Sequence, residues 1–215
     1  MKKIDGVFSG EMNIGYYVFC PENYDKNQKY PLVLFLHGAA ERGDGSKDSL
    51  PRVCKGALPK FAQAGEEYPF ILLCPQCPDN IVWNNVVVTL KRLVDEVAEQ
   101  YGADLDRIYC TGLSMGGFGT WEMGVTYPSF FAAIAPICGG GFSWRASALK
   151  DMPVWAFHGD ADDVVPISYS QTMVDAVNAA GGNAKFTIFP GVNHNSWDPA
   201  YLDTNVVEWL LEQKR

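Results

Sequence analysis

The sequence predicts a single domain of the α/β class, with a mostly parallel central sheet flanked by helices on both faces. Segments with helical periodicity alternate along the chain with short strand-like segments, which is typical of such a sheet. The run at residues 32–36 is entirely apolar, and such runs suit strands that are buried on both faces. The 215 residues contain no repeat and no linker-like stretch, so we expect residues 1–215 to form one compact unit.

Strands are expected where apolar and β-branched residues cluster between turn-forming residues. These segments are residues 12–20, 30–37, 70–74, 107–111, 131–138, 154–158 and 184–189. Helices are expected where apolar residues recur every three or four positions, at residues 85–101, 115–127, 168–180 and 204–213. Gly102, Pro128 and Gly181 follow the first three of these segments and are typical helix ends. Residues 38–51 are rich in Gly, Ser and Asp and are expected as a loop.

Composition and charge narrow the class of protein. The net charge is −8, from 17 Lys and Arg against 25 Asp and Glu, and no basic cluster occurs, so no nucleic-acid partner is expected. No apolar stretch has the length of a membrane span, and no signal-peptide core follows Lys2 and Lys3. We therefore expect a cytoplasmic protein, and the composition carries no signal for its oligomeric state.

The six cysteines are expected as reduced thiols, because the chain is large enough to fold without disulfides and lacks an export signal. Cys74 and Cys77 form a Cys-x-x-Cys sequence, but two prolines surround Cys77 directly after a strand, which favours a loop. A structural zinc site would require a second such pair, and the sequence has none. Neither a metal nor an organic cofactor is implied.

The segment 112–116 reads Gly-Leu-Ser-Met-Gly and matches the pattern Gly-x-Ser-x-Gly. It lies between a predicted strand and a predicted helix, where a nucleophilic serine can occupy a sharp turn with its hydroxyl exposed at the end of the sheet. A Cβ atom two residues before or after the serine would crowd that turn, which explains Gly112 and Gly116. The sequence therefore predicts Ser114 as a nucleophile.

A serine hydroxyl requires a base to remove its proton, and the base requires an acid to orient it. In enzymes with this turn, the partners follow in the chain order Ser, Asp or Glu, His. His194 follows the last predicted strand and is the predicted base, with His158 as the alternative. Asp162 is the predicted acid; Asp163 and Asp160 lie in the same loop and are alternatives, and the aspartates not used would serve turn formation.

The electrophilic half of such a site is an oxyanion hole formed by two backbone N–H groups. The sequence predicts the N–H of Met115, directly after the nucleophile, and the N–H of Ala39, in the loop after the strand at residues 30–37. His37 is expected to hydrogen-bond within this loop rather than to act as a base. Arg42 is expected either to pair with Glu41 or to contact a substrate carboxylate.

Together these motifs resemble the carboxylesterase/phospholipase-like branch of the α/β-hydrolase superfamily, which is related to dienelactone hydrolase and to esterases of the prolyl-oligopeptidase type. The resemblance covers most of the chain from Tyr30 onward, and its motifs lie at residues 36–43, 75–78, 106–109, 112–117, 158–162 and 194–198. It implies the α/β-hydrolase fold with a minimal lid domain or none. It also implies that Ser114, Asp162 and His194 form a catalytic triad, with Ala39 and Met115 as the oxyanion donors.

The function expected from these residues is hydrolysis of a small-molecule carboxylic ester through an acyl-enzyme. A peptidase or amidase of the prolyl-oligopeptidase type would use the same triad, whereas a non-catalytic binding protein would be expected to have lost one of its members. Aromatic residues on loops after the strands are candidates for the substrate cleft, because such loops form the binding site in open α/β sheets. These residues are Trp83, Phe142, Trp144 and Trp197.

Overall fold

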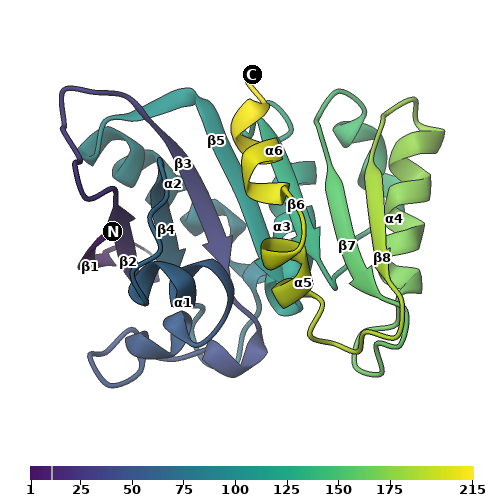
Figure 1. The fold of residues 1–215 in the computed structure, drawn as a ribbon, viewed down its shortest axis with the longest axis horizontal. Coiled ribbons are helices and arrows are strands. Elements are labelled where there is room, and N and C mark those ends of the chain that lie inside the picture. Colours follow the sequence, from purple (N-terminus) through teal and green to yellow (C-terminus); the bar gives the residue numbers. More distant parts are fainter. Residues whose placement is uncertain (11) are drawn as a thin grey trace.

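The computed structural model describes residues 1–10 and 12–215, and its strands form one eight-stranded sheet (Figure 1). The order across the sheet is β1-β2-β4-β3-β5-β6-β7-β8. The strands are β1 (Lys2–Phe8), β2 (Ile14–Cys20), β3 (Tyr30–Leu36), β4 (Ile71–Pro75), β5 (Ala103–Leu113), β6 (Ala133–Ile137), β7 (Trp155–Gly159) and β8 (Lys185–Phe189). β2 is antiparallel to both β1 and β4, whereas β3 to β8 are parallel. The predicted α/β class with a mostly parallel sheet is confirmed.

Helices cover both faces of this sheet and enclose two separate cores. α2, α3 and α4 pack on one face, and α1, α5 and α6 pack on the other, which Figure 1 shows with α5 and α6 crossing in front of the strands. The helices are α1 (Ala57–Gln63), α2 (Val87–Gln100), α3 (Met115–Thr126), α4 (Ser168–Ala179), α5 (Trp197–Leu202) and α6 (Val206–Glu212). Among the described residues, no helix has both the length and the apolarity that crossing a bilayer requires.

Three short elements are absent from the sequence-based expectation. β1 is an edge strand in which most residues are partly or fully exposed, so its sequence lacks the apolar run of a buried strand. α1 has seven residues and α5 has six, which is too short for a helical period to be recognised. β5 also begins at Ala103 rather than at residue 107, because its first residues are charged and partly exposed.

The parallel strands bring four loops from distant parts of the sequence to one edge of the sheet. The loops follow the carboxyl ends of β3, β5, β7 and β8, and they contain in turn Ala39, Ser114, Asp162 and His194. Carboxyl ends of parallel strands meet at the same edge, where open α/β sheets bind ligands. In the described part of the chain, no lid domain is inserted above this edge.

The turn from β5 into α3 depends on a very close approach between α3 and β3. A Cβ atom on Gly116 would lie 1.8 Å from the carbonyl oxygen of Leu36, which no side chain can tolerate. The first turn of α3 therefore rests directly on the backbone at the end of β3. Only glycine permits this contact.

We expect Gly116→Ala to lower the free energy of unfolding by about 2–3 kcal/mol, because the added methyl group must push α3 away from β3. Urea denaturation followed by circular dichroism measures this change. Gly56→Ala is the matched control, since the nearest atom to its added Cβ is 3.9 Å away, at Trp197. Equal losses in the two variants would contradict the close packing described for Gly116.

Candidate active site

Ser114 occupies a strained turn between β5 and α3. Its backbone has φ 53° and ψ −119°, a conformation that residues with a side chain rarely adopt. The N–H of Ser114 donates to the carbonyl of Ile137 at 3.0 Å, which ties the turn to the end of β6. A Cβ on Gly112 would lie 2.5 Å from the Leu36 carbonyl oxygen, so both glycines of the motif are sterically required, as the sequence predicted.

The structure brings the three residues of the predicted triad together. The imidazole of His194 lies between Asp162 and Ser114, with Nδ1 at 2.8 Å from Asp162 Oδ2 and Nε2 at 2.9 Å from Ser114 Oγ. This spacing fixes one tautomer: an ionised carboxylate can only accept a hydrogen bond, so Nδ1 must carry the proton. His194 Nε2 then accepts the hydroxyl proton of Ser114. The arrangement is that of a nucleophile, a base and an orienting acid.

Asp162, rather than Asp160 or Asp163, is the aspartate that faces His194. Its side chain is fully buried, and its Oδ1 accepts the backbone N–H groups of Val164 and Val165, both at 2.9 Å. Burial raises the pKa of Asp162, but the hydrogen bonds from His194 and from these two N–H groups outweigh burial, so the pKa lies below its ordinary value.

The other two aspartates of this loop have different positions. Asp160 Oδ1 accepts the N–H of Gly191 at 2.6 Å, which joins the loop after β7 to the loop that carries His194. Asp163 is exposed to solvent. Asp160 therefore links two loops that are distant along the chain, which differs from the local turn-forming role expected for an aspartate outside the triad.

The two predicted oxyanion donors line one cavity of about 370 Å³. Ala39 begins a short 3-10 helix (Ala39–Glu41), and Met115 begins α3, so helical hydrogen bonding leaves both N–H groups unused. The positive end of the α3 dipole also faces this point. The cavity is lined by Ala39, Arg42, Val82, Asn84, Met115 and Phe118. Sequence reasoning missed Val82, Asn84 and Phe118 as lining residues; the position of Phe118 in the first turn of α3, four residues after Ser114, is the available signal.

His37 and Trp83 support the loop that carries Ala39. His37 is almost fully buried, and its Nε2 accepts the N–H of Cys77 at 2.9 Å, so Nδ1 carries the proton and donates to the Gly38 carbonyl at 2.6 Å. Trp83 is fully buried and donates its indole N–H to the His37 carbonyl at 2.9 Å. Burial lowers the pKa of His37 to about 4, which keeps the ring neutral. His37 is thus a hydrogen-bonding residue within the loop, and Trp83 lies beneath it.

Gln76 is a second support of the same loop, and sequence reasoning did not identify it. Its side chain is buried, and Nε2 donates to the carbonyls of Glu41 and Ser49 at 2.9 and 2.8 Å. Its Oε1 accepts the N–H of Gly45 at 3.0 Å and the hydroxyl of Ser49 at 2.9 Å. Every polar group of this amide is therefore used to hold the loop, as expected for a buried amide.

Arg42 holds the loop through two backbone carbonyls. Its Nε donates to the Ala39 carbonyl at 3.0 Å, and its Nη1 donates to the Ile81 carbonyl at 3.2 Å. Arg42 also lines the cavity, so its guanidinium borders the space that a substrate would enter.

The other three aromatic candidates differ in burial. Trp197 is half-buried, packs edge-on against the His194 ring with centroids 5.5 Å apart, and lines a smaller cavity of about 110 Å³. Phe142 and Trp144 follow β6 and are exposed, with 57% and 79% of their surfaces accessible. Their rings lie 6.2 Å apart at the same edge of the sheet as Ser114.

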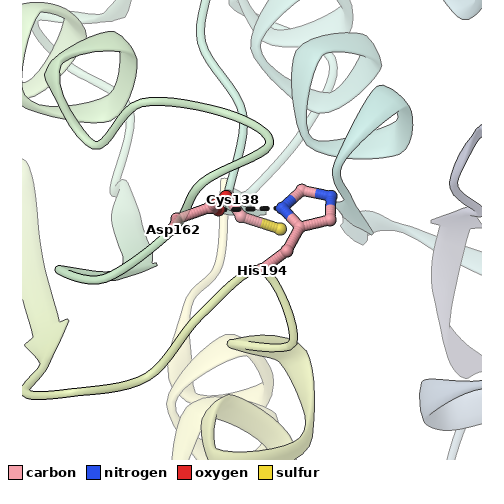
Figure 2. A group of neighbouring side chains, drawn as sticks. All are labelled: Cys138, Asp162 and His194. Atoms are coloured by element: carbon pink, nitrogen blue, oxygen red, sulfur yellow. Dashed lines mark hydrogen bonds and ion pairs between the residues drawn. The ribbon is translucent and has the colours of Figure 1, made fainter.

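Cys138, Asp162 and His194 form a cluster whose potential ligand atoms all lie within 4.8 Å of one another (Figure 2). Each of these potential ligand atoms already takes part in a hydrogen bond. Asp162 Oδ2 accepts from His194 Nδ1, and Cys138 Sγ accepts the N–H of Ser114 at 3.3 Å. Burial raises the pKa of the Cys138 thiol to about 12, which disfavours the thiolate that a metal would bind. The cluster is thus a hydrogen-bonded group beneath the nucleophile.

Known proteins resemble this chain over more than half of its length. A model of the phospholipase/carboxylesterase family matches residues 78–203. Poly(3-hydroxyalkanoate) depolymerase C of Paucimonas lemoignei is 42% identical over 132 residues, which are 54% of this chain and 30% of that protein. Acetylxylan esterase A of Emericella nidulans is 28% identical over 134 residues, which are 56% of this chain and 40% of that protein.

Similarity to solved structures extends over nearly the whole chain. The crystal structure of a thermostable esterase superposes with a TM-score of 0.88 at 33% identity, covering 99% of this chain and 63% of that one. The fold is that of the α/β-hydrolase superfamily, and the proteins that this chain resembles are carboxylic ester hydrolases. The chain belongs to the phospholipase/carboxylesterase family. It spans less than half the length of the two enzymes named above, the depolymerase and the acetylxylan esterase.

We expect the stability of the protein to fall as the pH falls from about 6.5 to about 4, partly because of His37. Its pKa is 6.5 when unfolded and about 4 in the folded protein, so in this range the unfolded chain binds the extra proton. The free energy of unfolding then decreases by up to about 1.4 kcal/mol per pH unit for this group. Urea denaturation at several pH values measures the slope. His37→Gln cannot titrate and should have a shallower slope; an unchanged slope would contradict this role of His37.

Proposed function

We propose that the chain hydrolyses small carboxylic esters through an acyl-enzyme formed on Ser114. The observation that carries this proposal is the position of His194, whose two ring nitrogens lie within hydrogen-bond distance of Asp162 Oδ2 and Ser114 Oγ. Membership of the phospholipase/carboxylesterase family supports the same chemistry.

Each member of the triad has a defined role in the proposed reaction. Ser114 Oγ attacks the ester carbonyl while His194 Nε2 takes its proton, and Asp162 stabilises the imidazolium that forms. His194 then gives the proton to the departing alcohol. A water molecule takes the place of the alcohol and attacks the acyl-enzyme while His194 takes its proton. The bond from the acyl carbon to Ser114 Oγ then breaks, His194 returns the proton to Oγ, and the acid leaves.

The N–H groups of Ala39 and Met115 would stabilise the negative charge that develops on the carbonyl oxygen. Both line the 370 Å³ cavity, and the supports from His37, Trp83 and Gln76 hold the first of them in a fixed loop. Donors that are fixed before the reaction need no reorganisation when the oxyanion forms, and this accounts for their large effect on rate.

The cavity beside these donors suits an uncharged, largely apolar part of the ester. Val82, Met115 and Phe118 supply apolar surface, and the only charged side chain among its lining residues is that of Arg42. The relatives named above include an acetylxylan esterase and a polyhydroxyalkanoate depolymerase. For this chain, we propose small esters as the substrate class.

We further propose that the chain acts in the cytoplasm and as a single folded unit. Its six cysteines are all buried and unpaired, which suits a reducing compartment. All the described strands belong to one sheet, which supports a single unit. Both statements remain predictions.

Removal of the nucleophile or the acid should abolish most of the turnover. For hydrolysis of a short p-nitrophenyl ester, we expect kcat to fall by at least about 10⁴-fold in Ser114→Ala and by about 10³–10⁴-fold in Asp162→Asn. Asp163→Asn is the matched control and should leave kcat nearly unchanged, because Asp163 is exposed. The triad assignment would be wrong if Asp163→Asn lost more activity than Asp162→Asn.

Ala39→Pro removes the proposed donor without removing a helical hydrogen bond. Proline is tolerated at the first position of a helix, and Gly38 before it already has the extended conformation, φ −76° and ψ −177°, that a following proline requires. We expect kcat to fall by about 10²–10³-fold with little change in thermal stability. Ala39→Gly keeps the N–H and should retain most of the activity; a similar loss in both variants would contradict a role for this N–H.

A further inference from the structure

The carboxylate of Asp162 contacts two histidines and two backbone N–H groups. Oδ1 accepts the two backbone N–H groups of Val164 and Val165. Oδ2 lies 2.8 Å from His194 Nδ1 and 3.1 Å from Nε2 of a second histidine, His158. Two imidazole nitrogens therefore lie close to one oxygen, and the single Nε2–H of His158 is shared between this oxygen and the Val165 carbonyl, 2.9 Å away.

The surroundings of His158 fix which of its nitrogens carries a proton. Nε2 faces only acceptors, the Val165 carbonyl at 2.9 Å and Asp162 Oδ2, so Nε2 must be protonated. Nδ1 lies 2.8 Å from the hydroxyl of Ser170, which also lies 2.8 Å from the Gly139 carbonyl and shares its proton between them. The ring is fully buried, and burial lowers the pKa of His158, which favours the neutral form.

We propose that His158 is a positioning residue of the triad, a neutral Nε2–H donor that holds Asp162 Oδ2 and reduces the basicity of this oxygen toward His194. A donor on one side of a carboxylate oxygen withdraws charge that the other donor would otherwise receive. With His158 present, this oxygen therefore holds the Nδ1 proton of His194 less strongly than it would without that neighbour. The inference deepens the proposed function, because it concerns the base of that reaction.

Few charged or titratable groups face this part of the site. His158 faces Asp162 on its own loop and is close to His194 from the loop after β8. Its neighbour on α4 is the uncharged Ser170. The hydroxyl of Ser170 in turn donates to the Gly139 carbonyl in the segment after β6. Asp162 is also close to Cys138, whose thiol stays neutral because burial raises its pKa to about 12. The shared oxygen of Asp162 is thus the direct route by which His158 influences His194.

His158→Leu and His158→Gln separate this role from a purely structural one. Leucine removes the donor, whereas glutamine places an amide N–H near the position of Nε2. We expect the pKa of His194, measured by NMR titration, to rise by about half a unit to one unit in His158→Leu and to return most of the way in His158→Gln. The acid limb of the pH profile of kcat/KM should move in the same direction. No rise, or an equal rise in both variants, would overturn the proposal.

Two further measurements keep the test independent of folding and of turnover. If His158→Leu does not fold, Ser170→Ala replaces it: losing the hydroxyl should weaken the hold on His158 and raise the pKa of His194 by a smaller amount, and no rise would contradict the proposal. In the unmodified protein, the ¹⁵N resonances of His158 should show a protonated Nε2 and an unprotonated Nδ1 at neutral pH; the other tautomer or a charged ring would refute it. These measurements need no substrate. A lack of esterase activity would therefore refute the proposed function, whereas the inference about His158 would still be decided by the NMR results.

Discussion

The backbone of Ser114 connects β5 to α3 with φ 53°, and the rest of the site is arranged around this turn. The conformation is costly for a residue with a side chain, of the order of 1–3 kcal/mol, so the surrounding structure must enforce it. Leu36 and Gly116 provide the enforcement, because the backbone of α3 contacts the carbonyl end of β3 without a side chain between them. As a result, the hydroxyl points toward the loops that follow β7 and β8, and the N–H of Met115 is left at the start of a helix.

The proposed acid of the site, Asp162, depends on a second constraint, the burial of a charged carboxylate. A buried charge is strongly destabilising unless its hydrogen-bonding positions are filled. Asp162 meets this requirement with two N–H groups from its own loop, with His194 Nδ1–H, and with the Nε2–H of His158 that it shares with the Val165 carbonyl. The same contacts fix the orientation of the carboxylate, and through it the tautomer of His194. The contacts that stabilise the buried charge are therefore the same contacts that orient Asp162 toward His194. A change that disturbs Asp162 is expected to lower both the stability of the protein and its activity.

Much of the fold was predictable from the sequence, because its central strands are apolar runs and its longer helices have a clear period. The edge strand β1 was not, since an exposed strand has no such run, and α1 was too short to have a period. The residues that the site brings together, Ser114, Asp162 and His194, were also predictable, because the sharp turn requires the glycine pattern and this type of sheet places the three residues after successive strands in a fixed chain order.

What the sequence could not supply were contacts between residues that are distant along the chain. Gln76 holds Glu41 and Ser49, and Trp83 holds His37, through side chains whose direction is set only by the folded sheet. The second histidine at Asp162 is of the same kind. His158 ends a buried strand, and nothing in its neighbouring residues indicates that Nε2 turns toward the acid of the site.

A crystal structure of the protein after reaction with a fluorophosphonate ester tests the central claim most directly, because this reagent leaves a tetrahedral phosphorus that resembles the proposed intermediate. We predict a covalent bond from phosphorus to Ser114 Oγ. One phosphonyl oxygen should lie about 2.7–3.1 Å from the backbone nitrogens of both Ala39 and Met115, the distance expected of oxyanion donors. His194 should remain hydrogen-bonded to Asp162. Attachment at another residue, or a phosphonyl oxygen directed away from these two N–H groups, would contradict the account.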